Sequence, residues 1–397
     1  MSRFLSYDPE QAYLVPPSVR DVLGADHLCF FVHRLLQRVE MKQFYDAYAS
    51  EGAPAYAPEM MLRVLLYAYA LGVTSMRRLE QRIREDLAFR YLAGGQEPDF
   101  WALNQFRRRH ARAINDVFTQ VLGMARQRGL ARLGKVAIDS TRIKANASRD
   151  RIEVERGRRA HDRRQVRRWQ QQGEEEDPNE GAGMRVAHGA QAQEPAAVRE
   201  ALKPLPRPQR RSRTDADARF LRERGGRFVL GYTAEIAVSE DHLIVAQRVT
   251  QNANDVGALL PMVDEVERQC RRLPQRVLAD SGFFSNGNVE GMRQRGVQAY
   301  IPDPNLAAEL HGGSGAGDRI GRMVISHPES LRMRQRLRSP AGRAMYEHRK
   351  TLVESVFGTL KEQRGMRQFR RRGLAHVAVE WSLASTAFNI TRLHRSR

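Results

Sequence analysis

The chain has 397 residues, 41% of them hydrophobic, and a formal net charge of +20. This length suggests two or three domains, and this apolar content is ample for a packed core, so the chain as a whole is not disordered. The two cysteines, Cys29 and Cys270, lie far apart without metal-ligand spacing, which argues against a disulfide or zinc pair and favours buried thiols in a reducing compartment.

The N-terminal segment offers no export signal. Residues 1–8 contain no apolar stretch of signal-peptide length. The longest apolar segment, 60–71, spans twelve residues and contains Arg63, whereas a membrane crossing needs about 20 residues. We therefore expect a cytoplasmic protein with no membrane partner, and a buried helix at 60–71 that begins after Pro58 and ends at Gly72.

Residues 1 to about 130 have a helical pattern. Thr74 or Ser75 can cap a helix that runs to about Ala88. In the segment 99–110, apolar residues and His110 share one side of a helix, so we expect Arg107 and Arg108 to face outward. That pattern fits a DNA recognition helix and an ordinary basic amphipathic helix equally well.

At Lys135 the pattern changes to strands. Between residues 149 and 217 the apolar content collapses, which predicts a charged insertion or linker, partly disordered, with at most a charged helix around 166–171. The remaining segments predict strands at 135–140, 227–238, 243–249, 276–279 and 298–302, helices at 258–271 and 289–295, and then a long basic helix. This order of strands and helices predicts an RNase H-like fold.

Three acidic residues stand at positions where apolar neighbours would hold them rigidly. Asp139 lies within a buried strand, Asp280 follows the Val-Leu-Ala run, and Glu354 lies on the late helix. An Asp at a strand end is also a common turn or cap residue, and an exposed helix Glu is ordinary. Together, however, the three predict a carboxylate site for two Mg²⁺ ions, because hard oxygen ligands suit Mg²⁺ and paired ions promote phosphodiester chemistry.

Positive charge is concentrated near the C-terminus. Residues 331–397 hold sixteen Lys and Arg against four Glu, which places twelve of the twenty net charges there. Contact with DNA phosphates explains this clustering better than a solvated surface does. The expected contacts are Arg367, Arg370, Arg371 and Arg372, as a clamp on the DNA backbone, and Lys361, which lies seven residues after Glu354 and so within about 20° of it on a helix.

Two further groups have open roles. Asn252, Asn254 and Asp255 follow a predicted strand and either form a turn or support the active site. Trp381 and Phe388, seven residues apart, fit a core better than a stacking platform for bases.

Nearly the whole chain resembles the bacterial insertion-sequence transposases of the DDE class, and most closely the insertion sequence 1182 family within the wider insertion sequence 4 and 5 grouping. The matching motifs are Ala-Ile-Asp-Ser-Thr at 137–141, Lys-Ala-Asn at 144–146, Gly-Tyr at 231–232, Ala-Val at 237–238, Thr-Gln-Asn-Ala-Asn-Asp at 250–255, Ala-Asp-Ser-Gly-Phe at 279–283, Tyr-Glu-His-Arg at 346–349 and Glu-Ser-Val-Phe-Gly-Thr-Leu-Lys at 354–361. The helical start through Arg107 and His110 resembles the amino-terminal domain of the same enzymes.

The resemblance implies a DNA transposase that uses two Mg²⁺ ions, with Mn²⁺ as a possible substitute. Asp139, Asp280 and Glu354 would bind the ions, free a 3′-hydroxyl at the element's ends and direct its attack on target DNA. Such an enzyme binds terminal inverted repeats and target DNA, works at the nucleoid, and acts as a homodimer or larger assembly because two DNA ends must be held.

A Tyr-Arg-Glu-Lys signature in these transposases contacts terminal DNA, and here it corresponds to Tyr346, Arg349, Glu354 and Lys361. One departure is that four residues separate Arg349 from Glu354, where the broader signature has three. On a regular helix Arg349 would point about 140° from Glu354 and Lys350 about 40° from it. Either the helix begins after Arg349, or Lys350 shares its role.

The expected organisation is therefore a helical N-terminal DNA-binding domain at 1–130, an RNase H-like DDE catalytic domain at 131–148 and 218–397, and a charged insertion at 149–217. A non-catalytic DNA-binding repressor and an RNase H-like nuclease that cleaves without joining are the rival functions.

Overall fold

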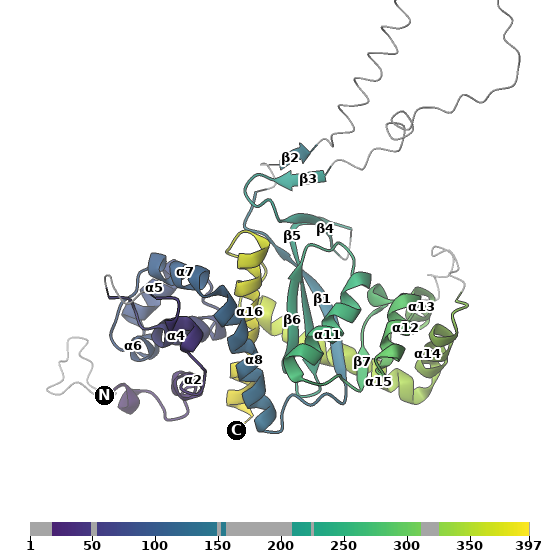
Figure 1. Cartoon of the computed structure of the whole chain (residues 1–397), viewed down its shortest axis with the longest axis horizontal. Helices are drawn as coiled ribbons and strands as arrows, with labels where there is room; N and C mark the ends of the chain where they lie inside the picture. The colour runs from purple at the N-terminus through teal and green to yellow at the C-terminus, as the bar shows by residue number, and fades with distance from the viewer. Residues whose placement is uncertain are drawn as a thin grey trace, which may run out of the picture.

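In the computed structural model the chain is described at residues 18–48, 54–148, 152–155, 209–223, 226–310 and 325–396. A group of helices lies beside a part built around a sheet, with the long C-terminal helix between them (Figure 1). Most of the predicted insertion, including the charged helix expected at 166–171, lies outside the described residues.

The N-terminal part is helical, as predicted. Its helices are α1 (Val19–Val22), α2 (Leu28–Leu36), α3 (Lys42–Tyr45), α4 (Pro58–Ala70), α5 (Met76–Glu85), α6 (Leu87–Ala93), α7 (Phe100–Arg109) and α8 (Ala111–Gln127). Pro58 opens α4, whose residues are mostly buried, and Gly72 follows it with a φ of 75°. No helix within the described ranges is both long and apolar enough to cross a membrane.

The single helix predicted to run from Ser75 to about Ala88 is wrong. Helix α5 ends at Glu85, and the Asp86 side chain accepts hydrogen bonds from the backbone N–H groups of Ala88 and Phe89. This N-cap starts α6 as a new helix, because the Asp86 carboxylate satisfies amides that a helix start leaves unpaired.

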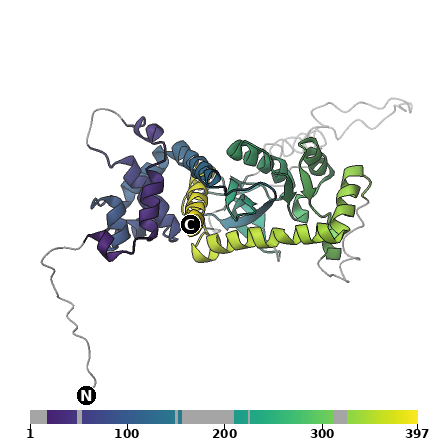
Figure 2. The same cartoon turned by 90° about the horizontal axis from the view of Figure 1, so that it is seen from below.

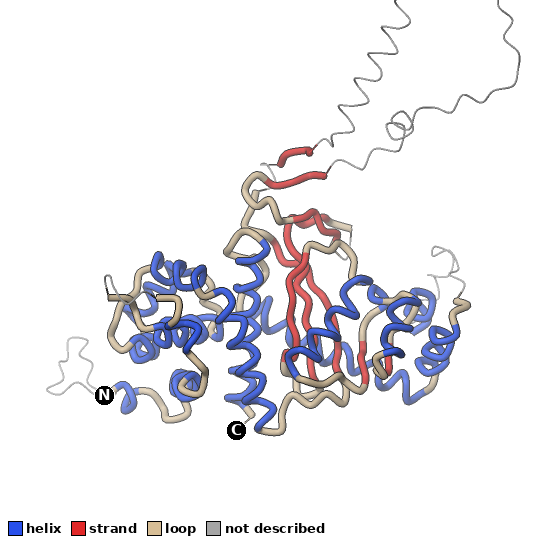
Figure 3. The backbone as a smooth tube through the Cα atoms, viewed as in Figure 1, coloured by secondary structure: helices blue, strands red, loops and turns tan. Residues whose placement is uncertain are grey.

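A sheet of six strands forms the centre of the second part (Figure 3). The strands are β1 (Val136–Lys144), β4 (Arg219–Arg222), β5 (Phe228–Ser239), β6 (Ile244–Thr250), β7 (Arg276–Leu278) and β8 (Gln298–Tyr300). β5 pairs antiparallel with β1 on one side and with β4 and β6 on the other, whereas β7 is parallel to β1 and β8 is parallel to β7. This is the predicted RNase H-like order.

Two strands that the sequence did not predict, β2 (Ile152–Glu155) and β3 (Gln209–Ser212), pair antiparallel where the chain enters and leaves the charged insertion. Strand β4 was not predicted either. The described residues therefore resume at 209, inside the predicted insertion 149–217.

Helices cover both faces of the sheet. They are α11 (Leu259–Cys270), α12 (Asn286–Gln294), α13 (Pro304–Leu310), α14 (Pro328–Arg338), α15 (Pro340–Gly358) and α16 (Leu374–Arg395), with the 3-10 turns η1 (Val256–Ala258) and η2 (Ser281–Phe283) and the π-helix η3 (Thr359–Gln363). Helix α11 packs on one face, and α15 crosses the other at a steep angle to the strands (Figure 2). Helix α15 thereby reaches β1, β5 and β8.

Helix α16 joins the two parts, because it packs against α8, α4 and α2 on one side and against β6 on the other. Trp381 and Phe388 are buried in it, as expected for core residues. The fully buried Glu380 of α16 accepts hydrogen bonds from the backbone N–H groups of Arg370 and Arg371 at 3.0–3.1 Å. This carboxylate therefore fixes the basic loop that precedes α16.

We predict that Glu380→Ala destabilises the protein, because two buried N–H groups lose their acceptor, at about 1–3 kcal/mol for each. Urea unfolding measures the loss, and trypsin should cut sooner at Arg370–Arg372. Glu380→Gln keeps one acceptor oxygen and should lose less stability than the alanine variant. An alanine variant as stable as the parent would contradict this role for Glu380.

Candidate active site

Parallel pairing of β1 with β7 brings two of the predicted acids together. Val136 pairs with Val277 and Ala137 with Leu278. If the same register is extended by two residues beyond Leu278, Asp280 lies beside Asp139. Adjacent strands in a sheet are about 4.8 Å apart. The two aspartates, 141 positions apart in the sequence, thus lie side by side where β7 ends, at the fourth residue of the longer strand β1.

The loop after β7 orients Asp280. Its Oδ1 accepts a hydrogen bond from the N–H of Gly282 at 2.9 Å, which caps the 3-10 turn η2. A Cβ atom on Gly282 would lie 3.0 Å from that Oδ1 and 3.5 Å from Oδ2 of Asp255. Residue 282 therefore has to stay small for the Asp280 carboxylate to keep its place, whereas the contact with Asp255 would be an ordinary one.

Asp255 belongs to this site, which supports one of the two readings left open by the sequence. Its Oδ1 accepts from Ser140 Oγ at 2.7 Å and from Arg142 Nη1 at 3.1 Å. Arg142 also donates from Nη2 to the carbonyl of Ala253 at 2.9 Å. The turn at 252–255 is thereby tied to the residue that follows Asp139. Ser140 and Arg142 were not predicted, although the two-residue alternation of a strand places them on one face.

Helix α15 carries the counter-charge of Asp139. Arg349 Nη1 donates to Asp139 Oδ2 at 3.0 Å, and the Arg349 residue is 4% exposed. Burial alone would lower the pKa of Arg349, but the charges of Asp139, Tyr346 and Asp280 raise it above its ordinary value. Burial raises the pKa of Tyr346, and Asp280 and Asp139 raise it further. Both aspartates, Tyr346 and Arg349 therefore form one electrostatic group.

Lys361 lies near the same group. Burial lowers its pKa, while the negative charge of Asp139 acts in the opposite direction. Lys361 lies in the π-helix η3 and is partly buried. It is thus close enough to Asp139 to sense its charge.

Glu354 is not brought to the two aspartates. Its side chain is exposed on α15, and five residues along a helix place it about 140° away from Arg349, which faces Asp139. Among the described residues, no group of three His, Cys, Asp or Glu side chains is placed to hold a metal ion. The sequence predicted three clustered carboxylates, and the structure brings together two.

The structure also decides between the two explanations of the Arg349 spacing. Helix α15 begins at Pro340, so the suggestion that it starts after Arg349 is wrong. Lys350 is exposed, whereas Tyr346 and Arg349 are buried against the acidic site. Both side chains contact groups of the acidic site, and their contact with DNA stays a prediction.

The other predicted DNA contacts divide by exposure. Arg108, Arg367, Arg370 and Arg372 are exposed and Arg371 is partly buried. The expectation that Arg107 faces outward is wrong: it is 2% exposed and donates to the hydroxyl of Tyr69 at 2.9 Å. Arg107 lies next to the apolar face of α7, and its burial depends on Tyr69, which lies 38 residues away in the sequence.

Comparison with protein families assigns both parts of the chain. Residues 17–109 match a family described as "Transposase domain (DUF772)". Residues 131–390, more than half of the chain, match the family described as "Transposase DDE domain". The chain belongs to this DDE transposase family. It is a DNA transposase with an RNase H-like catalytic fold, an enzyme class that uses divalent metal ions.

Three solved structures overlap with this transposase only loosely. A Mos1 transposase paired-end complex with left transposon end has 7% identity and a TM-score of 0.20, and covers 83% of this chain and 87% of that one. A pre-cleavage Mos1 transpososome has 9% identity and a TM-score of 0.19, and the match covers 89% of this chain and 84% of that one. A Mos1 mariner paired-end complex with Mn has 9% identity and a TM-score of 0.19, with 83% of this chain and 86% of that one covered. Such low scores carry no argument. A comparison with curated proteins finds no match.

We expect strong coupling between Asp139 and Arg349. Arg349→Ala should destabilise the transposase by about 3 kcal/mol, because it removes the counter-ion of a partly buried carboxylate, and the double variant with Asp139→Ala should lose less stability than the sum of the single losses. Urea unfolding of the four proteins gives the coupling energy. The exposed pair Arg293–Glu290 serves as the control and should couple far more weakly, because water screens exposed charges. Additive losses at Asp139 and Arg349 would show that the pair does not form.

Gly282→Ala should reduce activity and leave stability nearly unchanged. The added methyl crowds the Asp280 carboxylate, which can move, but its displacement misplaces the site, and we expect a loss of about 10–100-fold in DNA joining. Gly287→Ala is the matched control, because its Cβ would lie 3.9 Å from the nearest atom, Ser285 Oγ. Equal activity of the two variants would count against a functional role for this loop.

Proposed function

We propose that the transposase cuts DNA at the ends of its own element and joins the freed 3′-hydroxyl to target DNA, with Asp139, Asp280 and Glu354 as catalytic carboxylates. The observation that supports this most is the placement of Asp139 beside Asp280 within a transposase DDE domain. Carboxylate oxygens such as those of these two neighbouring aspartates are the donors that Mg²⁺ takes in phosphoryl-transfer sites, with substrate phosphates completing the coordination.

Two divalent ions, Mg²⁺ or Mn²⁺, would activate the attacking oxygen and stabilise the leaving oxygen. The side chains of the chain itself prepare the site for this chemistry. Ser140 and Asp255 hold the backbone next to Asp139, Gly282 leaves room for the Asp280 carboxylate, and Arg349 offsets the negative charge of the pair.

Glu354 is proposed as the third carboxylate because it lies on α15 between Arg349 and Lys361, which both interact with Asp139. Its exposed side chain is free to swing towards the end of the sheet. Arg349 holds the position nearest Asp139, so Glu354 reaches the site only if the side chains of α15 rearrange there.

DNA would contact the exposed basic side chains, which are Arg108, Lys350, Arg367, Arg370 and Arg372. Lys361 is proposed to reach a phosphate beside the carboxylates, and Arg371 to support the clamp from its partly buried position. Arg107, Tyr346 and Arg349 are left out of this surface because they are buried.

We infer the finer identity from the sequence motifs: a member of the insertion sequence 1182 family that binds terminal inverted repeats as a dimer or larger assembly, in the bacterial cytoplasm where its DNA lies. The proposed domains are 1–130, 131–148 with 218–397, and the insertion 149–217. One revision concerns Asp215 and Asp217, which accept hydrogen bonds from the N–H groups of Gly373 and Leu374 and so belong with the catalytic domain.

A strand-transfer assay tests the proposal. A labelled terminal-repeat duplex and a plasmid are incubated with Mg²⁺ and either the parent protein or the Asp139→Ala, Asp280→Ala or Glu354→Ala variant. We expect each variant to retain DNA binding and to lose joining by at least about 1000-fold, several kcal/mol of transition-state stabilisation. Glu347→Ala, an exposed glutamate on the same helix, is the control and should still join.

Other outcomes would favour other functions. Cleavage without joining by the parent protein would indicate a nuclease, and binding without either reaction, on a verified repeat, would indicate a repressor. Full joining by Glu354→Ala alone would mean that the third carboxylate is another residue.

A further inference from the structure

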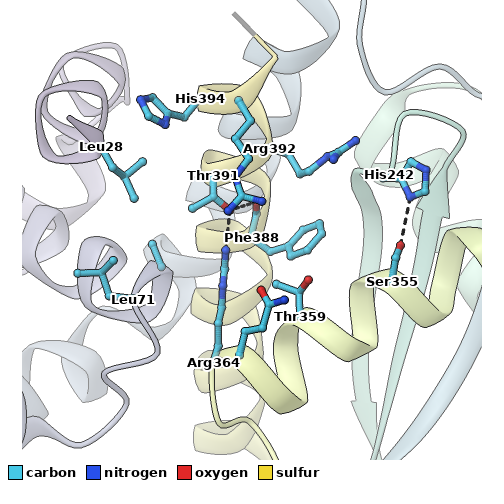
Figure 4. Close-up of a pocket in the computed structure, with 13 residues that line it drawn as sticks. Leu28, Leu71, His242, Ser355, Thr359, Arg364, Phe388, Thr391, Arg392 and His394 are labelled. Atoms are coloured by element: carbon cyan, nitrogen blue, oxygen red, sulfur yellow. Dashed lines mark hydrogen bonds between the residues drawn. The ribbon is translucent and has the colours of Figure 1, made fainter. Parts of the chain in front are cut away.

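A cavity of about 470 Å³ lies between the N-terminal helices and the catalytic part (Figure 4). Helix α2 and the end of α4 form one wall, and the end of α16 forms another. The turn between β5 and β6, the end of α15 and the π-helix η3 complete it. None of the proposed catalytic carboxylates lines this cavity.

The lining of the cavity is cationic. Arg364, Arg392 and Arg395 give it this charge. Two histidines, three hydroxyl side chains and the amide of Gln363 complete the polar lining, and no lining residue is acidic. The carboxylate of Asp241, in the neighbouring turn, accepts hydrogen bonds from Arg132 at 2.7 and 2.9 Å. Arg392 reaches only the backbone carbonyl of Asp241, at 3.2 Å.

Arg364 is the decisive residue. It is 6% exposed, donates from Nη2 to the hydroxyl of Thr391 at 2.5 Å, and stacks over Phe388 with 5.5 Å to the ring centroid. Its Nη1 is buried and makes no hydrogen bond to any part of the chain that is described. A buried guanidinium without an anion is costly, and burial with the charge of Arg395 lowers the pKa of Arg364 to about 10.

The dipole of α16 explains the position of only some of these basic side chains. Arg392, His394 and Arg395 lie in the last turn of α16, where cations interact favourably with the helix carbonyls. Arg364 belongs to a different element: it follows the π-helix η3, whose Thr359 and Gln363 also line the cavity. Such wide helical turns occur often at functional sites.

We propose that this cavity binds a phosphate group, held by the Arg364 guanidinium with Arg392 and Arg395 around it. A phosphate offers the oxygens that a guanidinium fork pairs with, and the neighbouring hydroxyls suit its remaining oxygens. The group belongs either to the DNA backbone or to a free phosphate-bearing ion. The site does not depend on which carboxylates are catalytic.

The cavity lies where the two parts of the chain touch. Gly72, after α4, packs so closely on the backbone of Arg364 that a Cβ at residue 72 would lie 3.0 Å from the Arg364 Cα. On the other wall, His394 of α16 hydrogen-bonds to the carbonyl of Asp26 at 2.7 Å. A phosphate bound here would therefore strengthen the attachment of the helical part to the catalytic part.

The experiment compares the full-length parent protein with Arg364→Gln and Arg395→Gln. The first arm measures the midpoint of thermal unfolding with inorganic phosphate against chloride at equal ionic strength. The second measures binding of a duplex DNA by fluorescence anisotropy over a series of NaCl concentrations. Arg293→Gln, an exposed arginine of α12 paired with Glu290, is the control and should behave as the parent in both arms.

A free phosphate ligand predicts that inorganic phosphate raises the parent's unfolding midpoint, that Arg364→Gln abolishes this shift, and that DNA affinity is unchanged. A backbone phosphate predicts weaker DNA binding for Arg364→Gln, with the slope of log K against log salt reduced by about 1. Arg395 is exposed, so Arg395→Gln should fold even if Arg364→Gln does not. It should reduce the phosphate-dependent shift or the DNA affinity in the same direction as Arg364→Gln, by a smaller amount. Parent-like behaviour of the folded variants in both arms would overturn the proposal.

Discussion

The parallel pairing of β1 with β7 sets the position of every other group in the acidic site. Without it, Asp139 and Asp280 would be distant in space as they are in sequence. Because the strands run in the same direction, the carboxyl end of β7 lies beside Asp139 within the longer β1, and the turn at Gly282 and the turn at Asp255 converge there. The cost of this arrangement is electrostatic, since two carboxylates are held close together in a partly buried place.

Arg349 offsets that cost, and this changes the interpretation of the late helix. A family signature suggested that Tyr346 and Arg349 face DNA, but α15 packs them against the sheet and leaves Lys350 and Glu354 at the surface. The extra residue between Arg349 and Glu354 makes this unavoidable in a regular helix: a side chain that faces Asp139 and one five positions later cannot point the same way. The same helix therefore offers a counter-ion on one side and a candidate ligand on another.

The sequence predicted what depends on local pattern. The strand order, the positions of Asp139 and Asp280 and the buried Trp381 follow from apolar runs and their spacing. The break at Asp86 was missed, although an Asp before an apolar run is a cap signal. Two features had no local signal: the burial of Arg107 depends on Tyr69, 38 residues away, and that of Arg364 depends on Phe388 and Thr391 of another helix. Long basic side chains are expected at the surface, so only the packing shows which are inside.

The two buried arginines of the late segment have opposite electrostatic environments. Arg349 has a carboxylate at 3.0 Å, whereas the lining around Arg364 holds only cations and neutral groups. A protein that pays to bury a guanidinium usually pairs it, and the first case follows this rule within the chain. Each arginine leaves one guanidinium nitrogen without a hydrogen bond among the described residues, but only the second, at the junction that α16 forms between the helical part and the sheet, has no carboxylate in the lining around it. A bound anion would give Arg364 the negatively charged partner that Arg349 already has in Asp139. It would also strengthen the attachment of the helical part to the catalytic part, which must act on the same DNA.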